Sequence, residues 1–116
     1  MSCIIKTCIG DFELRTLLQE VKKDIFSLLN NSVEQLKLYG SYARGDYNSD
    51  SDIDIFLVYN EVNLKNIDDL ISEISVEYQL KYGIMVNIYD ISISYYNKYK
   101  NISPLIKNVE REGVEI

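Results

Sequence analysis

The stretch YGSYARGDYNSDSDIDIFLVYN, residues 39–60, decides the fold. It joins a Gly-Ser turn at Gly40 and Ser41 to a polar loop, and then to an apolar run over residues 52–59 that contains two aspartates. The Ile, Phe, Leu, Val and Tyr content of this run is typical of a mostly buried strand. A carboxylate inside such a strand is costly unless something positive lies on it. The stretch therefore predicts a strand with a cation beside it.

Apolar periodicity predicts the elements on either side of this stretch. We expect strands over residues 33–39, 52–59 and 84–90, and helices over residues 11–31, 41–44, 64–81, 92–100 and 104–112. Ser103 and Pro104 are a cap residue and a first-turn proline, and Gly113 stands where the last helix would stop. The order of these elements indicates a single α/β domain over residues 1–116.

Composition excludes several classes of function. The net charge of -6 would repel a phosphate backbone, so we expect no direct nucleic-acid binding, although one metal-bound nucleotide remains compatible with it. The absence of histidine excludes histidine-based triads and metal ligands, so acid–base chemistry must use carboxylates, Lys or Tyr.

The compartment follows from the cysteines and from hydropathy. Cys3 and Cys8 have no further cysteine partners, which is typical of small apolar side chains in a reduced, intracellular protein. No apolar run approaches the roughly 20 residues of a membrane span, and we expect a cytoplasmic protein without membrane contact.

The two aspartates predict a metal site. Asp52 and Asp54 are two residues apart, so on a strand they project from one face and repel each other unless a cation lies between them. Hard oxygen ligands with room for phosphate oxygens suit Mg²⁺. Upstream, Gly40 permits close backbone approach, Ser41 opens a helical turn whose N–H groups favour anions, and Arg44 is a candidate counter-charge. This combination favours phosphoryl or nucleotidyl transfer.

Three other interpretations compete with this one. Asp50, Asp52, Asp54 and Glu61 match ligand positions of a calcium loop, but Ile55 stands where that loop needs glycine. The glycines match neither a P-loop nor a dinucleotide fingerprint. The acids could simply solvate a turn, which accounts for Asp46 and Asp50 but not for Asp54 inside the apolar strand.

At these residues the chain resembles a known family. "GSYARGDYNSDSDIDIFLV" is similar to the signature of the DNA polymerase β-type nucleotidyltransferase superfamily, and its Ser-x-Ala-Arg-Gly and Ser-Asp-Ile-Asp details look most like the minimal nucleotidyltransferase branch. The resemblance implies a small mixed sheet flanked by helices, ATP as substrate, and Mg²⁺, two ions in the active complex, on Asp52 and Asp54. It implies triphosphate contacts from Gly40 and Ser41.

The resemblance also implies a third carboxylate on a neighbouring strand. In "GIMVNIYDI" that catalytic position is filled by Asn87, which cannot accept a proton. Asp90 faces the other way on a regular strand, and only a bulge near Tyr89 would bring it round.

The same resemblance implies a partner. Minimal nucleotidyltransferases of this kind are similar to antitoxins that move AMP from ATP to a tyrosine of a HEPN-domain toxin, so we expect a protein partner and a homo- or hetero-oligomer. Tyr95, Tyr96 and Tyr99 are either interface contacts or tyrosines half-buried on a short helix. The alternatives are a non-catalytic binding module and transfer to a small molecule such as an aminoglycoside.

Overall fold

The computed structural model describes residues 11–60 and 66–116, and its elements follow the predicted order. Cys3, Cys8, Glu61 and the expected helix start at Leu64 lie outside the described residues. The helices are α1 (Asp11–Leu29), η2 (Asn30–Ser32), α2 (Ser41–Arg44), α3 (Ile67–Tyr82), α4 (Ile93–Tyr99) and α5 (Pro104–Glu112). The strands are β1 (Val33–Tyr39), β2 (Ile53–Tyr59), β3 (Val86–Ser92) and β4 (Val114–Glu115).

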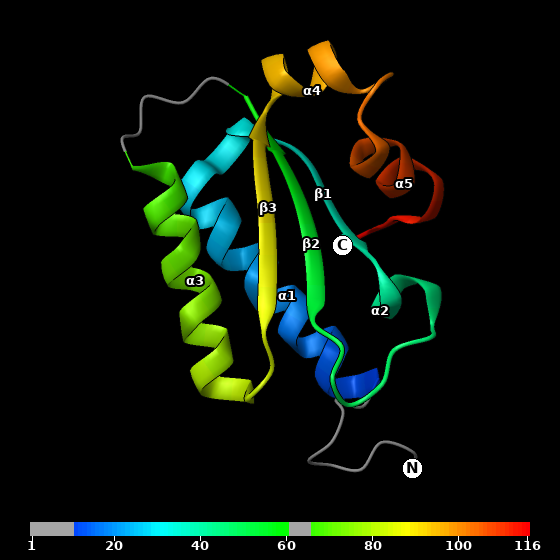
Figure 1. The fold of residues 1–116 in the computed structure, drawn as a ribbon. Helices are drawn as coiled ribbons and strands as arrows, with labels where there is room; N and C mark the ends of the chain where they lie inside the picture. Colours follow the sequence, from blue (N-terminus) through cyan, green and yellow to red (C-terminus); the bar gives the residue numbers. More distant parts are fainter. Residues whose placement is uncertain (1–10, 61–65) are drawn as a thin grey trace.

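The four strands form one mixed sheet in the order β3-β2-β1-β4 (Figure 1). β1 runs antiparallel to β2 and to the short β4, whereas β2 and β3 are parallel. The parallel pair requires a crossover, which α3 supplies between β2 and β3. The structure thus confirms the expected small mixed sheet flanked by helices.

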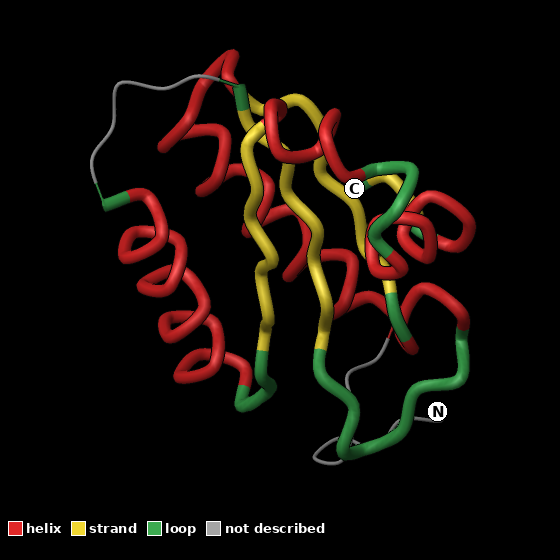
Figure 2. The backbone as a smooth tube through the Cα atoms, turned by 45° about the horizontal axis from the view of Figure 1, so that its top comes forward, coloured by secondary structure: helices red, strands yellow, loops and turns green. Residues whose placement is uncertain are grey.

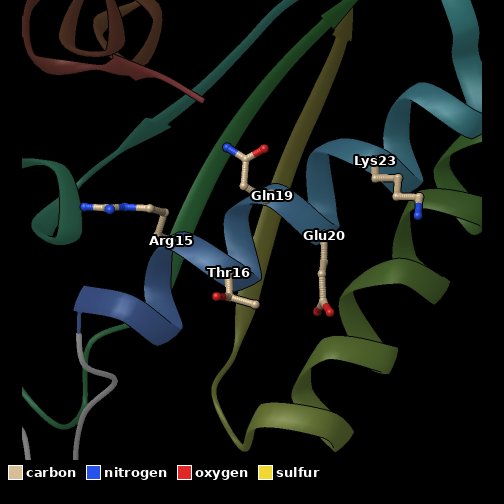
Figure 3. A pocket seen from close by; sticks show the side chains of 5 residues that line it. All are labelled: Arg15, Thr16, Gln19, Glu20 and Lys23. Carbon is tan, nitrogen blue, oxygen red and sulfur yellow. The ribbon is translucent and has the colours of Figure 1, made fainter.

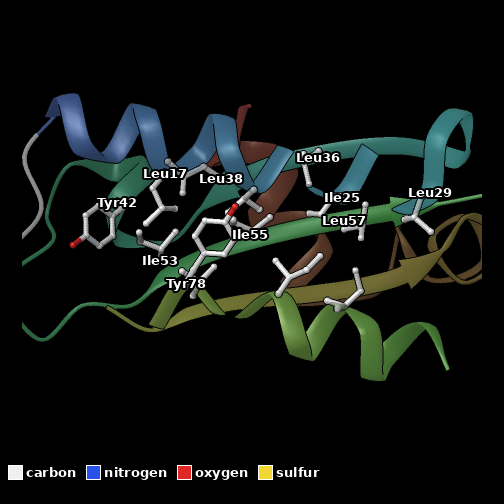
Figure 4. Close-up of a cluster of buried hydrophobic side chains, with 14 residues drawn as sticks. Leu17, Ile25, Leu29, Leu36, Leu38, Tyr42, Ile53, Ile55, Leu57 and Tyr78 are labelled. Atoms are coloured by element: carbon white, nitrogen blue, oxygen red, sulfur yellow. The ribbon is translucent and has the colours of Figure 1, made fainter. Parts of the chain in front are cut away.

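Helices α1 and α3 cover one face of the sheet. Their apolar stripes meet the alternate side chains Ile53, Ile55 and Leu57 of β2, all of which are fully buried (Figure 4). Two hydrogen bonds join the helices at the edge of this core: the Tyr78 hydroxyl donates to Asp24 over 2.5 Å, and the Tyr82 hydroxyl donates to Glu20 over 2.7 Å. This layer fixes which side chains of β2 point to the opposite face.

Helices α4 and α5 cover part of that opposite face. The buried residues there are Phe56, Val58, Ile91, Tyr96, Ile106 and Val109. Asp54 precedes Phe56 by two positions, so it lies on the same face, at the start of β2. Figure 2 shows the loops that enter β2 and β3 at the end of the sheet away from α4. The start of β2 therefore carries its acids on an open part of the sheet.

Several boundaries differ from the predictions. β3 begins at Val86 rather than residue 84 and runs on to Ser92, whose hydroxyl accepts the Tyr95 N–H over 3.1 Å and caps α4. The first helix ends at Leu29, because Asn30 adopts a left-handed conformation with φ of 53°. β4 was not predicted. None of the helices within residues 11–60 and 66–116 is long and apolar enough to span a bilayer.

Candidate active site

The Gly-Ser turn lies directly against Asp54. Tyr39, the last residue of β1, pairs with Asp54 across the sheet, so Gly40 begins beside that carboxylate. Gly40 has φ of 79° and ψ of -156°, and a Cβ there would lie 2.5 Å from Asp54 Oδ2. Both the backbone conformation and the lack of space require glycine. The turn can therefore bring its main chain to the acids with no side chain between them.

Helix α2 follows from this turn. The Ala43 and Arg44 N–H groups both donate to the Gly40 carbonyl at 3.0 Å, which closes the first turn of the helix. The N–H groups that open a helix have no carbonyl partner within it and favour anions. Gly40 and Ser41 thus open α2 next to Asp54, and their contact with phosphate oxygens stays a prediction.

Asp52, Asp54 and Asn87 come together at the start of the parallel strand pair. Asn87 is the neighbour of Asp54 in the register between β2 and β3. Its Nδ2 donates to Asp52 Oδ2 over 3.1 Å and to Asp54 Oδ1 over 3.3 Å. Asp52 and Asn87 are exposed, whereas Asp54 is half-buried. A single amide therefore bridges two carboxylates at an open sheet surface.

Burial shapes the electrostatics of Asp54. Loss of solvent raises the pKa of its carboxyl above the ordinary value. The hydrogen bond from Asn87 lowers the same pKa, the charge of Asp52 raises it, and the charge of Arg44 lowers it. The pair thus benefits from any positive group between its members.

The donor set fits Mg²⁺. Asp52 and Asp54 offer carboxylate oxygens, and rotation of the Asn87 amide would offer a carbonyl oxygen in place of the Nδ2 that now bridges the acids. Within residues 11–60 and 66–116, no group of three or more His, Cys, Asp or Glu side chains is suited to hold a metal. The third carboxylate implied by the family resemblance is therefore absent from the described site, and Asn87 stands in its position.

Asp90 does not reach the site. The register between β2 and β3 runs unbroken from Ile53 opposite Val86 to Tyr59 opposite Ser92, so the bulge that would have turned Asp90 round is absent from this strand pair. Asp90 instead lies near Asp68 in the first turn of α3, and its Oδ2 is buried without a hydrogen-bond partner among the described residues. Burial, and after it the neighbouring carboxyl group of Asp68, raises the pKa of Asp90 to about 7.

Arg44 is held by carboxylates beside the site. Its Nη1 donates to Glu112 Oε1 at the end of α5 over 2.8 Å, and its Nε donates to Asp46 over 3.1 Å. The guanidinium is close enough to lower the pKa of Asp54. Glu112 was missed from the sequence because it lies 68 residues away and nothing local marks it as a partner.

Two hollows elsewhere do not coincide with the acids. One, of about 360 Å³, lies on α1 and is lined by Arg15, Thr16, Gln19, Glu20 and Lys23 (Figure 3). Another, of about 340 Å³, is lined by residues of α1 and α3, on the far side of the sheet. Asp52 and Asn87 are instead exposed on the surface that the described residues form.

Comparisons with known proteins agree with this geometry. The nucleotidyltransferase domain model matches residues 14–115. A Methanocaldococcus jannaschii protein named "Putative protein adenylyltransferase MJ0141" is 35% identical over 104 residues, which are 90% of this chain and 99% of that protein.

Solved structures share the fold. One described as a "putative minimal nucleotidyltransferase" has a TM-score of 0.57 at 21% identity, over 89% of this chain and 95% of that one. A chain of a "toxin-antitoxin with AMP-PNP" has a TM-score of 0.56 at 19% identity, over 84% of this chain and 70% of that one. The family model and the relative over nearly the whole chain together show that the chain belongs to the nucleotidyltransferase domain family.

Proposed function

We propose that this protein transfers AMP from ATP to a hydroxyl of a partner protein, a tyrosine of a HEPN-type toxin, and thereby acts as its antitoxin. The proposal depends on one observation, the cluster of Asp52, Asp54 and Asn87 beside the turn at Gly40. The relative named as a protein adenylyltransferase and the fold shared with a toxin–antitoxin complex support this choice of reaction and partner.

Each site residue has a role in this proposal. The main chain at Gly40 and Ser41 would hold triphosphate oxygens, and Asp52, Asp54 and the Asn87 carbonyl would hold Mg²⁺. Bound magnesium would neutralise phosphate charge and orient the acceptor oxygen. That oxygen bonds to the α-phosphorus, the bond to pyrophosphate breaks, and the hydroxyl proton must leave. Of the three side chains, only the two aspartates can accept a proton, because an amide cannot.

The open position of the acids supports a protein acceptor. A small molecule would need walls to hold it, and the described site offers a sheet surface instead. A partner protein brings its own surface, so the two chains together complete the acceptor pocket in a hetero-oligomer.

The test is transfer of label from α-³²P-ATP with Mg²⁺ to the product of the neighbouring gene. We expect labelling by the unaltered protein and a loss of at least about a hundredfold in Asp52→Asn and Asp54→Asn. Asp50→Asn is the matched control, because Asp50 is an exposed acid of the same loop outside the cluster. Equal labelling by Asp54→Asn, or no label on the partner, would overturn the proposal.

Asn87 favours a second candidate function, which is a binding module that neutralises its partner without chemistry. Loss of a general base costs on the order of 10²–10⁴ in rate, so an amide at the third position is compatible with a weak or silent enzyme. In that case Asp54→Asn would still protect cells from the partner and would bind it without ATP. Loss of protection in that variant, with binding retained, would reject the binding-only function.

A further inference from the structure

Lysines and tyrosines gather on α4 in an otherwise acidic chain. Residues 91–109 contain Lys98, Lys100 and Lys107 and no Asp or Glu, although the whole chain has a net charge of -6. The rings of Tyr95 and Tyr99 lie 4.5 Å apart, and Lys98 Nζ lies 5.5 Å from the Tyr99 ring. We call Tyr95, Lys98, Tyr99 and Lys100 the α4 surface.

The positive charge of this surface is available for a partner. Lys98 and Lys100 contact aromatic rings, Lys100 Nζ lying 5.7 Å from the Tyr96 ring. The salt bridges found among the described residues involve neither lysine. The nearby acid Glu110 of α5 is engaged by the Tyr96 hydroxyl, which donates to it. An ammonium group over a ring keeps its charge and favours a carboxylate from outside.

The α4 surface is continuous with the candidate active site. Asn87 and Tyr89 are alternate residues of β3 and therefore lie on one face. Tyr89 stacks on Phe56 with ring centroids 6.0 Å apart. Tyr95 lies close enough to Tyr89 to raise the pKa of its hydroxyl further, after the larger effect of burial. Figure 1 shows α4 where β2 and β3 end, whereas the acids lie where these strands begin. From Asn87 to its end at Ser92, β3 spans about 17 Å, the length of about five extended residues.

We propose that the α4 surface docks an acidic segment of the protein acceptor and so sets its acceptor hydroxyl beside Asp52 and Asp54. The inference rests on the proposed function and adds a statement of its specificity. The acceptor should carry carboxylates about five extended residues away from the hydroxyl that is modified. The tyrosine rings contribute contact area that loses little conformational entropy, and the lysines contribute charge.

A polynucleotide fits this surface less well. It carries one charge per nucleotide along its whole length, so any stretch that continued from α4 to the site would meet Asp52 and Asp54 without compensation. Stacking of successive bases also needs several exposed rings. Within α4, Tyr95 alone is a large hydrophobic side chain counted as exposed, at 43%. A peptide can concentrate its acids at one end and remain neutral at the other.

The test uses two synthetic peptides that contain one tyrosine, with three glutamates placed either five residues from it or adjacent to it. Fluorescence anisotropy without ATP measures binding at low and high salt. We expect salt-sensitive binding of both peptides and a loss of about tenfold for the Lys98→Glu/Lys100→Glu variant. Lys22→Glu/Lys23→Glu, equal in charge but on α1 across the sheet, should bind within about twofold of the unaltered protein. Thermal melting verifies that both variants fold.

Transfer assays then separate this inference from the proposed function. With ATP and Mg²⁺, the five-residue peptide should be labelled with at least about tenfold higher kcat/KM than the adjacent one, chiefly through effective positioning of its hydroxyl. Equal binding to both charge variants, or binding of an oligoadenylate in place of the peptides, would overturn the docking surface alone. Normal peptide binding without any label transfer would overturn the proposed function while the docking surface stands.

Discussion

Two pairs of aspartates in this small domain have opposite environments. Asp52 and Asp54 lie at the start of β2 on the open face of the sheet, where the amide of Asn87 bridges them. Asp90 lies farther along β3 on the face covered by α3, where Asp68 is its acidic neighbour. In the first pair a donor comes from a third residue, whereas in the second pair one acid must supply the proton itself.

The difference shows that neighbours, and not residue type alone, set the electrostatic environment of a pair of carboxylates. Burial raises the pKa of Asp54, but the hydrogen bond from Asn87 and the charge of Arg44 both oppose that rise. Burial and Asp68 together raise the pKa of Asp90 to about 7, so this group holds a proton close to neutrality. The first pair is suited to a cation and the second to a shared proton.

The largest expected effect comes from removing the space beside the first pair. Gly40→Ala would place a methyl group 2.5 Å from Asp54 Oδ2 at a backbone φ of 79°, so the turn or the carboxylate must move. We expect AMP transfer to fall by about a hundredfold. Gly45→Ala is the control, since its φ of 89° is also positive but nothing lies within 4 Å of the added Cβ.

That control should lose about 1 kcal/mol of stability from backbone strain and keep its activity. Label transfer and thermal melting of both variants measure the effects. Equal activity losses in the two variants would show that strain alone, and not contact with Asp54, makes glycine necessary at position 40.

Replacing the bridging amide by a third acid tests whether the first pair is built for a cation. Asn87→Asp should lower stability without metal, because three carboxylates then repel one another, and Mg²⁺ should raise its melting temperature more than that of the unaltered protein. We expect AMP transfer to rise by about tenfold, since a proton acceptor is restored. Asn31→Asp, an exposed change in η2, is the control. A variant indifferent to Mg²⁺ would contradict the site.

The second pair predicts a pH dependence of stability. The folded-state pKa of Asp90, about 7, lies above the ordinary 3.8, so its stabilising protonation is complete below pH 4 and is lost as pH rises through 7. Asp90→Asn cannot ionise at this position. Between pH 5 and 8 its stability should therefore rise relative to that of the unaltered protein by about 1–2 kcal/mol, a range that allows for partial exposure. Thermal melting across this range measures it. Parallel curves for the two proteins would show that the pair shares no proton.

The smallest expected effect concerns the cation beside the first pair. Arg44 is 46% exposed in its salt bridges with Asp46 and Glu112, so Arg44→Gln should change stability by less than about 1 kcal/mol. ATP affinity, measured by calorimetry with Mg²⁺, should fall a few-fold because the positive potential near Asp54 is reduced. Arg15→Gln, an exposed change on α1, should leave it unaltered. Identical ATP affinities in the two variants would show that Arg44 does not contribute to nucleotide binding.

Local sequence predicted most of the fold because its signals are local. The apolar run after Asp52 and the Gly-Ser turn gave β2 and α2 within a residue of their observed starts. β4 has two residues and exists through pairing with Lys37 and Leu38 of β1, which no local pattern announces.

The same contrast between local signals and tertiary contacts applies to the candidate site. The spacing of Asp52 and Asp54 predicted their common face, and the parallel register then placed Asn87 against them. The Asp90–Asp68 and Arg44–Glu112 contacts join residues far apart in sequence, so only the tertiary structure reveals them.

The crowding at Gly40 gives a way to follow the history of this gene. Since the oxygen of Asp54 occupies the volume of any side chain there, descendants that still use the reaction must keep glycine at position 40. Copies of the gene whose product no longer needs the reaction can acquire alanine or serine at position 40 while both aspartates are still present. A genome survey of position 40 should therefore detect inactive copies that a survey of the two aspartates would miss.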